Sequence, residues 1–264
     1  MADLASHIPA RAMAFAFGFS DEDALRFEEY FTALVNTYGC NDDAKQAKAL
    51  DIYKSFLQEK LAGHDASRGE HTLVSSLMEF EIEGRKLTDE ERLGLMWTTA
   101  GGAIDTTKHA IGHLVYQLGI NREVRRKLIE EPSRIPAAIE ESLRMDAPAF
   151  MMARTVTQDV TVNGVSMKEG DHVLIAYGFA NRDETRFLCP HDMKIDRDEN
   201  SHLTFGNGDH NCLGKYLARL ELKIVAEELL ATIPDYQLVN PDQHPILHGG
   251  VIWGFDTLPI RVPR

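Results

Sequence analysis

The chain has few cysteines and no long hydrophobic run, and each shortage excludes a class of protein. Its three cysteines, Cys40, Cys189 and Cys212, are too few and too scattered for a disulfide framework. We therefore expect a reducing compartment and predict a cytoplasmic location. No stretch approaches the roughly 20 apolar residues that span a bilayer, so no membrane association is predicted. Residues 1–19 do not resemble a secretion signal, because Arg11 interrupts their apolar stretch.

Basic residues are also in short supply. Lysine and arginine number 28 against 41 aspartates and glutamates, which gives a net charge of −13. A nucleic-acid-binding surface needs a basic excess, so no nucleic-acid partner is predicted. Repeats and linkers rich in Gly, Pro or Ser are absent from the sequence as well. We therefore predict a single domain over residues 1–264, long enough to bury a sizeable core.

Apolar residues recur at helical spacing through the first half of the sequence. This pattern predicts helices at 3–17, 21–38, 43–62, about 88–118, 121–130 and 134–145. Thr88 and Glu91 have the spacing of a capping box at the start of the long central helix, and Asp21 is the expected cap of the second helix. Gly101 and Gly102 fall inside the central helix, where each glycine costs about 1 kcal/mol relative to alanine. Such a pair indicates a kink or a close backbone approach.

From Arg154 onward, apolar and polar residues alternate, which is typical of strands. Turn signals at Asn163-Gly164 and Glu169-Gly170 favour short antiparallel pairs. One more amphipathic helix is predicted at about 214–232, and a strand pair is predicted near 251–262. The predicted fold class is therefore mainly α with small β-sheets (α+β).

The chemistry concentrates in a glycine-rich loop at 205–214, with the sequence FGNGDHNCLG. Gly206 and Gly208 let the backbone fold tightly and turn amide groups toward one point. Cys212 lies just before the predicted helix, where free amides and the helix dipole stabilise an anion, so its sulfur is expected as the thiolate. A thiolate held in this way is a suitable axial ligand for haem iron. His210 can meet a carboxylate of the same cofactor.

Other functions of this cysteine compete with that interpretation. A lone cysteine is often a small core residue, and this alternative stays open. A phosphate-binding loop is disfavoured, because one residue too many separates Gly208 from Gly214 and because Tyr216 follows Lys215 where Ser or Thr is required. A zinc site lacks further Cys or His ligands at short spacing in the sequence. A cysteine nucleophile needs a base, which the sequence does not place.

The loop resembles the cytochrome P-450 signature F-G-x-G-x-H-x-C-x-G at every fixed position. Gly102–Thr107 is similar to the oxygen-activating stretch of that family's central helix, [AG]-G-x-[DE]-T-[TS], and Glu141–Arg144 matches E-x-x-R. Arg154 and Asn181–Asp183 match the segment between that motif and the loop. The resemblance extends over about residues 3–262. It implies a bacterial-type, soluble P-450 fold that lacks its N-terminal part, of which this chain would be the C-terminal two-thirds.

The resemblance also implies an activity and a cofactor. The expected activity is that of a haem-thiolate monooxygenase, which uses dioxygen to hydroxylate an apolar small organic substrate, with haem b as cofactor and Cys212 as the axial ligand of its iron. The cofactor-binding residues implied by the family motifs are Cys212, His210, Arg154, Phe205, Gly206, Gly214 and Gly102. Arg154 and His210 are the expected partners of the haem propionates. For Arg154, a solvent-facing strand residue is the alternative.

Thr106 and Asp105 are the catalytic residues that the resemblance implies. A hydroxyl and a carboxylate beside the glycine pair can organise water and relay protons during dioxygen activation. The alternative from the residues alone is that Thr106 bonds a carbonyl one turn back and that Asp105 pairs with Lys108. Glu141 and Arg144 have the spacing of a pair on one helix. For them the resemblance implies a buried structural pair that supports the cysteine loop.

A ferredoxin-type electron donor is the expected protein partner. Lys215 and Arg219, together with Arg125-Arg126-Lys127, would form a basic patch that attracts an acidic ferredoxin. An ordinary solvated helix face explains the same charges.

Two positions depart from the family pattern. Ala103 replaces the second glycine of the oxygen-activating stretch. Asp192 stands where the family usually has an arginine, so the expected triad of one glutamate and two arginines is incomplete. With the missing N-terminal part, these departures leave an alternative function: a truncated non-catalytic haem-binding remnant, or one subunit of a split enzyme. A haem-binding sensor or carrier without turnover is a further possibility.

Overall fold

The structure is a computed structural model that describes residues 4–37, 42–64 and 71–263, and it divides into two compact units. One unit ends at Lys108 and the other begins at His109, so the boundary falls inside the long helix α5 (Asp89–Ile120). Each unit is described by itself, and the single domain over 1–264 stays a prediction. Cys40 lies outside the described residues.

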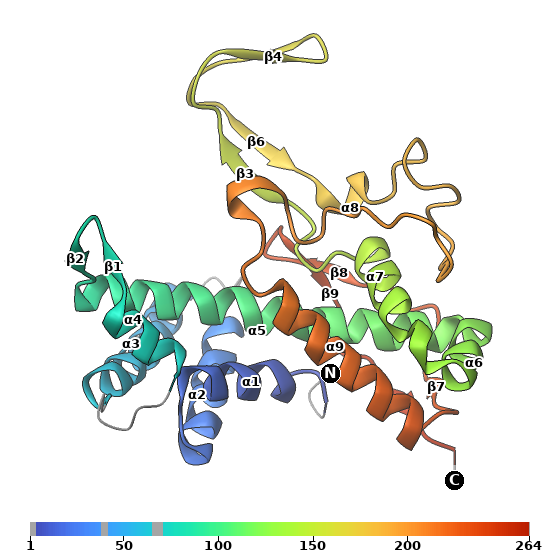
Figure 1. Cartoon of the computed structure of the whole chain (residues 1–264), viewed down its shortest axis with the longest axis horizontal. Helices are drawn as coiled ribbons and strands as arrows, with labels where there is room; N and C mark the ends of the chain where they lie inside the picture. The colour runs from blue at the N-terminus through green and yellow to red at the C-terminus, as the bar shows by residue number, and fades with distance from the viewer. Residues whose placement is uncertain (1–3, 38–41, 65–70, 264) are drawn as a thin grey trace. The chain divides into compact units, whose positions relative to one another are not determined.

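The unit that ends at Lys108 is built from helices (Figure 1). Its elements are α1 (His7–Phe17), α2 (Asp21–Val35), α3 (Asp43–Ala62), α4 (Leu73–Glu79), the hairpin β1 (Glu81–Ile82) and β2 (Arg85–Lys86), and the first part of α5. α2 packs against both α1 and α3. The rings of Phe17, Phe27, Tyr53 and Phe56 are buried in this core. Sequence analysis predicted the three long helices before α5 but not α4 or the hairpin.

Caps decide where two of these helices begin. The cap of α2 is Ser20, whose hydroxyl accepts a hydrogen bond from the amide of Asp23 at 3.2 Å, so the expectation of Asp21 was wrong. The capping box of α5 is confirmed. The amide of Thr88 donates to the Glu91 carboxylate at 2.8 Å, and the amide of Glu91 donates to the Thr88 hydroxyl at 3.2 Å.

α5 runs as one α-helix to Ile120 rather than ending near residue 118. A Cβ atom placed on Gly101 or Gly102 would meet nothing within 4 Å. Within the described residues, the close backbone approach predicted from this glycine pair is therefore absent.

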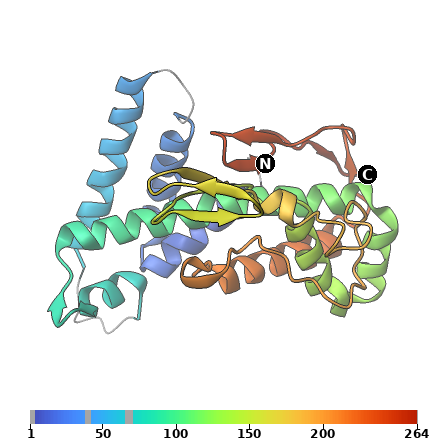
Figure 2. The ribbon, with the colours of Figure 1, turned by 90° about the horizontal axis from the view of Figure 1, so that it is seen from above.

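Three helices pack together in the unit that begins at His109. They are α6 (Arg122–Glu130), α7 (Ile135–Met145) and α9 (Lys215–Thr232), and α9 contacts both of the others. The two views of the ribbon show these three helices close together (Figures 1 and 2). Aliphatic side chains of α7 and α9 form much of this core: Ile135, Ala138, Ile139, Leu143, Leu222, Val225 and Leu229. All three helices lie within a few residues of their predicted ends.

The strands of this unit form short antiparallel pairs. The pairs are β3 (Met152–Thr155) with β6 (His172–Ile175), β4 (Val160–Val162) with β5 (Val165–Met167), β8 (Ile246–His248) with β9 (Ile252–Gly254), and β7 (Gln237–Leu238) with β10 (Ile260–Arg261). Figure 1 shows the β4–β5 ribbon projecting beyond the β3–β6 pair. A short helix, α8 (Tyr177–Ala180), follows β6. The mainly α fold class with small sheets is confirmed.

The predicted pairing of the last strands was wrong. β9 and β10 both fall in the range 251–262, but β9 pairs with β8 and β10 pairs with β7. β8 and β9 form a hairpin across residues 249–251, whereas the partner of β10 depends on where the rest of the unit places the edge of β7. Among the described residues, none of the helices combines the length and the hydropathy needed to cross a bilayer.

Candidate functional site

The cysteine loop presents its sulfur to solvent. Cys212 is an exposed, free cysteine, and its neighbours Leu213 and Tyr216 are 90% and 75% exposed. The interpretation of Cys212 as a small core residue is therefore wrong. α9 begins at Lys215, so the thiol lies just before the N-terminus of an 18-residue helix. The free amides and the dipole at such a terminus favour an anion.

The loop is closed by its own backbone. Gly206 and Gly208 have φ angles of 68° and 72°, in the left-handed region that favours glycine. With the chain turned in this way, the amide of Cys212 donates to the carbonyl of Phe205 at 2.8 Å. The side-chain amide of Asn211 donates to the carbonyls of Phe205 at 3.4 Å and Gly206 at 3.1 Å. Cys212 is therefore held by a compact turn rather than by side-chain packing.

His210 and Arg154 belong to the same unit as Cys212. His210 is exposed at the end of a single 3₁₀ turn, Gly208–His210. Arg154 lies half-buried on β3, and its guanidinium donates to the carbonyl of Ala153 at 2.8 Å. Neither side chain has an ion-pair partner within the described part of the chain. Both therefore remain available to an acidic ligand group.

The donor set of this loop fits a haem thiolate. A porphyrin supplies four nitrogen ligands of its own, so its iron needs one protein sulfur and not a cluster of side chains. Exposed Cys212 meets that requirement, and its neighbour Leu213 is exposed as well. Within residues 4–37, 42–64 and 71–263, no group of three or more His, Cys, Asp or Glu side chains could hold a metal ion.

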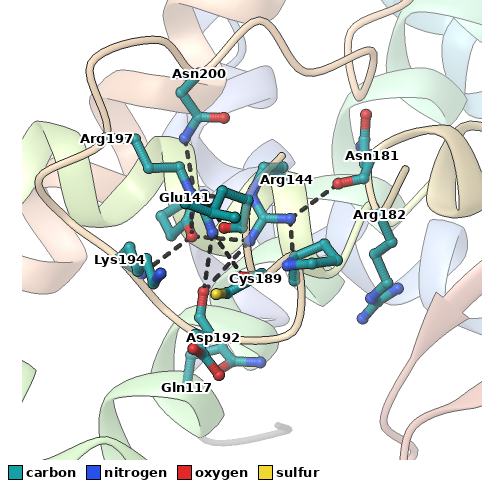
Figure 3. Close-up of polar contacts among 12 residues, drawn as sticks. Gln117, Glu141, Arg144, Asn181, Arg182, Cys189, Asp192, Lys194, Arg197 and Asn200 are labelled. Carbon is teal, nitrogen blue, oxygen red and sulfur yellow. Dashed lines mark hydrogen bonds and ion pairs between the residues drawn. The ribbon is translucent and has the colours of Figure 1, made fainter. Parts of the chain in front are cut away.

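α7 carries a buried ion-pair network (Figure 3). Glu141 and Arg144 are both 0% exposed, and two hydrogen bonds of 2.8 Å join them. The Arg144 guanidinium also donates to the carbonyls of Asn181 and Pro190, each at 2.9 Å. Two amides complete the shell of Glu141: the main-chain amide of Lys194 at 3.0 Å and the side-chain amide of Asn200 at 3.1 Å. The network joins α7 to the segment that precedes the cysteine loop.

Arg197 is the second arginine of this network, and sequence analysis missed it. Its Nε donates to Glu141 at 2.8 Å, and its side chain is 9% exposed. Asp192, at the position expected to be arginine, contributes its main-chain carbonyl, which accepts from Arg197 at 3.3 Å and from Arg144 at 3.5 Å. The expectation of an incomplete triad was therefore wrong. The second guanidinium is that of Arg197, which lies further along the chain than Asp192.

Electrostatics explain how this carboxylate stays charged inside the protein. Burial alone would raise the pKa of Glu141. Hydrogen bonds from Arg144, from the amide of Lys194 and from Arg197 outweigh that effect and hold the pKa below its ordinary value. Sequence analysis missed Arg197 because it lies in the polar stretch Asp196-Arg197-Asp198, which has the composition of a solvated loop.

Gly102, Asp105 and Thr106 lie on α5 in the unit that ends at Lys108. The Thr106 hydroxyl donates to the carbonyl of Gly102 at 2.6 Å, and Asp105 pairs with Lys108 at 2.5 Å. These are the two contacts that the purely structural interpretation predicted. Since Cys212 belongs to the other unit, the catalytic role of Thr106 and Asp105 stays a prediction.

The predicted basic patch is not assembled as expected. Arg125 is only 7% exposed, and its guanidinium donates to the carbonyl of Tyr236 at 2.7 Å. Arg126 is exposed and pairs with Glu123 at 3.0 Å. Neighbouring residues point about 100° apart around a helix, so one arginine enters the core while the next faces water. Arg219 is also withdrawn from the patch, because it pairs with Glu140 at 2.6 Å.

Comparisons with known proteins identify the family of this chain. The family model described as cytochrome P450 matches residues 26–234. A steroid C26-monooxygenase of Mycobacterium tuberculosis (strain CDC 1551 / Oshkosh) is 32% identical over 263 residues, which cover 98% of this chain and 70% of that protein. The polyketide biosynthesis cytochrome P450 PksS of Bacillus subtilis (strain 168) is 32% identical, and the match covers 100% of this chain and 65% of PksS.

Solved structures show the same likeness. The structure of Bacillus subtilis PksS superposes with a TM-score of 0.90 at 31% identity, covering 99% of this chain and 67% of that one. CYP109E1 from Bacillus megaterium in complex with testosterone gives a TM-score of 0.89 at 31% identity, covering 98% of this chain and 71% of that one. The chain thus spans about two-thirds of the length of these relatives.

Proposed function

Because this chain belongs to the cytochrome P450 family, we propose that it is a haem-thiolate monooxygenase in which Cys212 is the axial ligand of the haem iron. Members of the family bind haem b. The observation that carries the proposal for this chain is the exposed, free thiol of Cys212, held by the Phe205 carbonyl just before α9. When bound, haem supplies the iron centre at which dioxygen is activated.

The side chains of this protein have distinct parts in the proposal. The closed turn at 205–214 and the N-terminus of α9 stabilise the Cys212 anion. The side chains of Arg154 and His210 hold the acidic edge of the cofactor. Thr106 and Asp105 hold and move protons, and the Gly102 carbonyl orients the Thr106 hydroxyl at 2.6 Å. Gly206, Phe205 and Gly214 shape the turn.

The proposed substrate is an apolar small organic molecule. Two relatives point to this class: one is named a steroid C26-monooxygenase, and CYP109E1 was solved with testosterone and with corticosterone. In this chain, apolar side chains at 150–152 and at 251–252 are those expected to meet it. A panel of steroids and other apolar compounds, assayed for oxygenated products, tests the class.

A ferredoxin-type electron donor and a cytoplasmic location belong to the same proposal. The donor is supported by exposed Lys127 and by Lys215, which remain after Arg125 and Arg219 are withdrawn into internal contacts. The location rests on the few scattered cysteines, which suit a reducing compartment. Product formation with a ferredoxin and its reductase, compared with other donors, tests the partner.

The experiment that tests the central proposal is Cys212→Ala. The wild-type chain is titrated with haem, reduced and exposed to carbon monoxide, and the expected result is a thiolate-type Soret band. Cys212→Ala should abolish that band. Cys189→Ala is the matched control, because Cys189 is also exposed and free but lies outside the loop, and it should leave the band unchanged. A normal band in the Cys212 variant would remove this residue from the role.

A further inference from the structure

The residue next to Glu141 on α7 anchors a second ion-pair cluster, which reaches the cysteine loop. Glu140 accepts hydrogen bonds from Arg219, from Nε at 2.6 Å and Nη2 at 2.7 Å, and from His202 at 3.1 Å. Burial alone would raise the pKa of Glu140, but these bonds outweigh that effect and lower the pKa to about 2. Glu140 is therefore a carboxylate at neutral pH and holds Arg219 by a bidentate pair of hydrogen bonds.

His202 ties the same carboxylate to the start of the loop. Its Nδ1 accepts a hydrogen bond from the amide of Thr204 at 3.2 Å, so Nε2 is the nitrogen that donates to Glu140. The hydroxyl of Thr204 donates to the carbonyl of Leu143 at 2.7 Å. The main chain just before Phe205 is therefore attached to α7 at two points.

Arg219 also meets the ring of Phe205. The guanidinium carbon lies 4.5 Å from the centre of that ring, a cation–π distance. The carbonyl of the same Phe205 accepts the amide of Cys212 at 2.8 Å. The pKa of Arg219 is raised, chiefly by its hydrogen bonds to Glu140, and Tyr216 and Cys212 make smaller contributions. One side chain thus links α7, α9 and the residue that holds the cysteine.

We propose that Arg219 is a positioning residue for Cys212, held in that role by Glu140 and His202. Its guanidinium lies over the ring of Phe205 and so fixes the carbonyl that binds the Cys212 amide, and it adds a positive charge beside the loop. The consequence for catalysis rests on the proposed function, in which Cys212 is the iron ligand. This role differs from the docking role first expected for Arg219, because its charge is already paired with Glu140.

The positioning part is tested in the haem-free chain by hydrogen exchange of the Cys212 amide. Arg219→Gln should speed that exchange by about tenfold or more, because Phe205 is released. Arg219→Lys should give a smaller increase in the exchange rate, since lysine keeps the charge but cannot form the bidentate hydrogen bonds. Lys223→Gln is the matched control on the same helix, where Lys223 pairs with Glu227 at 3.4 Å, and should change nothing. Wild-type exchange in Arg219→Gln overturns the proposal, provided that its circular dichroism shows a folded chain.

The electrostatic part is tested in the haem-bound protein by its reduction potential. Arg219→Gln removes a positive charge and should lower the potential, whereas Glu140→Gln removes a negative charge and should raise it. A role limited to structural support predicts shifts of the same sign in both variants, or none, and either result overturns this part. Failure of the wild-type chain to take up haem contradicts the proposed function instead, and the exchange result still decides the positioning.

Discussion

Glu141 and Cys212 belong to the same unit, yet the protein surrounds these two reactive groups in opposite ways. Glu141 is 0% exposed and accepts hydrogen bonds from two arginines and two amides. Cys212 is exposed, and its main-chain amide is held by one hydrogen bond to the carbonyl of Phe205. The buried group is fully satisfied and therefore suited to stability. The exposed group keeps its side chain free and is therefore suited to chemistry.

A second contrast separates two carboxylates of the packed helices α7 and α9. Glu140 has Arg219 and His202 as partners, and its pKa is lowered to about 2. Glu221 is 7% exposed and one of its oxygens has no hydrogen-bond partner in the described structure, so burial raises its pKa to about 7. The pKa values of the two glutamates thus move in opposite directions, because Glu140 has cationic partners and Glu221 has none among the described residues to offset its burial.

The largest expected effect follows from breaking the buried network with Arg144→Met. The change leaves the carbonyls of Asn181 and Pro190 without a donor and removes one arginine from Glu141. Breaking a buried pair costs about 3–5 kcal/mol, so the free energy of unfolding should fall by that amount. Urea denaturation measures it. Arg126→Met, which removes an exposed pair on α6, should change the stability little, and equal losses in the two variants would contradict the contrast.

A smaller effect is expected from Glu221→Gln, and it depends on pH. The unfolded carboxyl ionises near pH 4.5, whereas the folded one ionises at about 7, so the wild-type protein loses stability as the pH rises between these values. The loss amounts to roughly 3 kcal/mol, at 1.36 kcal/mol for each pKa unit. Glu221→Gln cannot ionise and should remove this loss. Urea denaturation at pH 4.5 and pH 8 checks it, and a wild-type stability that is flat over this window would contradict it.

The smallest effect is expected in the loop itself. Gly206 has a φ angle of 68°, and a side chain in this left-handed region costs about 1–2 kcal/mol, so Gly206→Ala should lower the stability by that amount. Gly214 has a φ angle of −84°, and a Cβ there would meet nothing within 4 Å. Gly214→Ala should therefore be neutral in the same denaturation assay. If both variants behave alike, backbone conformation does not control this turn.

Local chemistry made much of the fold predictable. The capping box at Thr88 and Glu91 and the periodicity of α3, α7 and α9 are properties of neighbouring residues, and the structure reproduces them. The cysteine loop was identified in the same way, from glycines at fixed spacing before a helix. The pairing of β10 with β7 was not predictable, because these strands lie far apart in the chain and only packing brings them together, whereas β8 and β9 form a local hairpin that sequence analysis missed.

The charged residues of the site also show which features the sequence predicts and which only packing decides. Arg197 and Arg219 look in the sequence like solvated side chains, and both prove to be bound to glutamates of α7. Arg125 looks like its neighbour Arg126 but enters the core. For Thr106 and Asp105, the contacts on α5 leave the catalytic role as a prediction.

The sequence alone determined the longer helices, the mainly α fold class and the turn that presents Cys212, because each follows from patterns among residues close together in the chain. Tertiary structure decided that β10 pairs with β7 and which arginine completes the shell of Glu141. It also decided that Arg219 pairs with Glu140 and lies over the ring of Phe205. These choices depend on groups that lie far apart in the chain, and hydrogen-bond partners for a buried charge are found only once packing has brought those groups together.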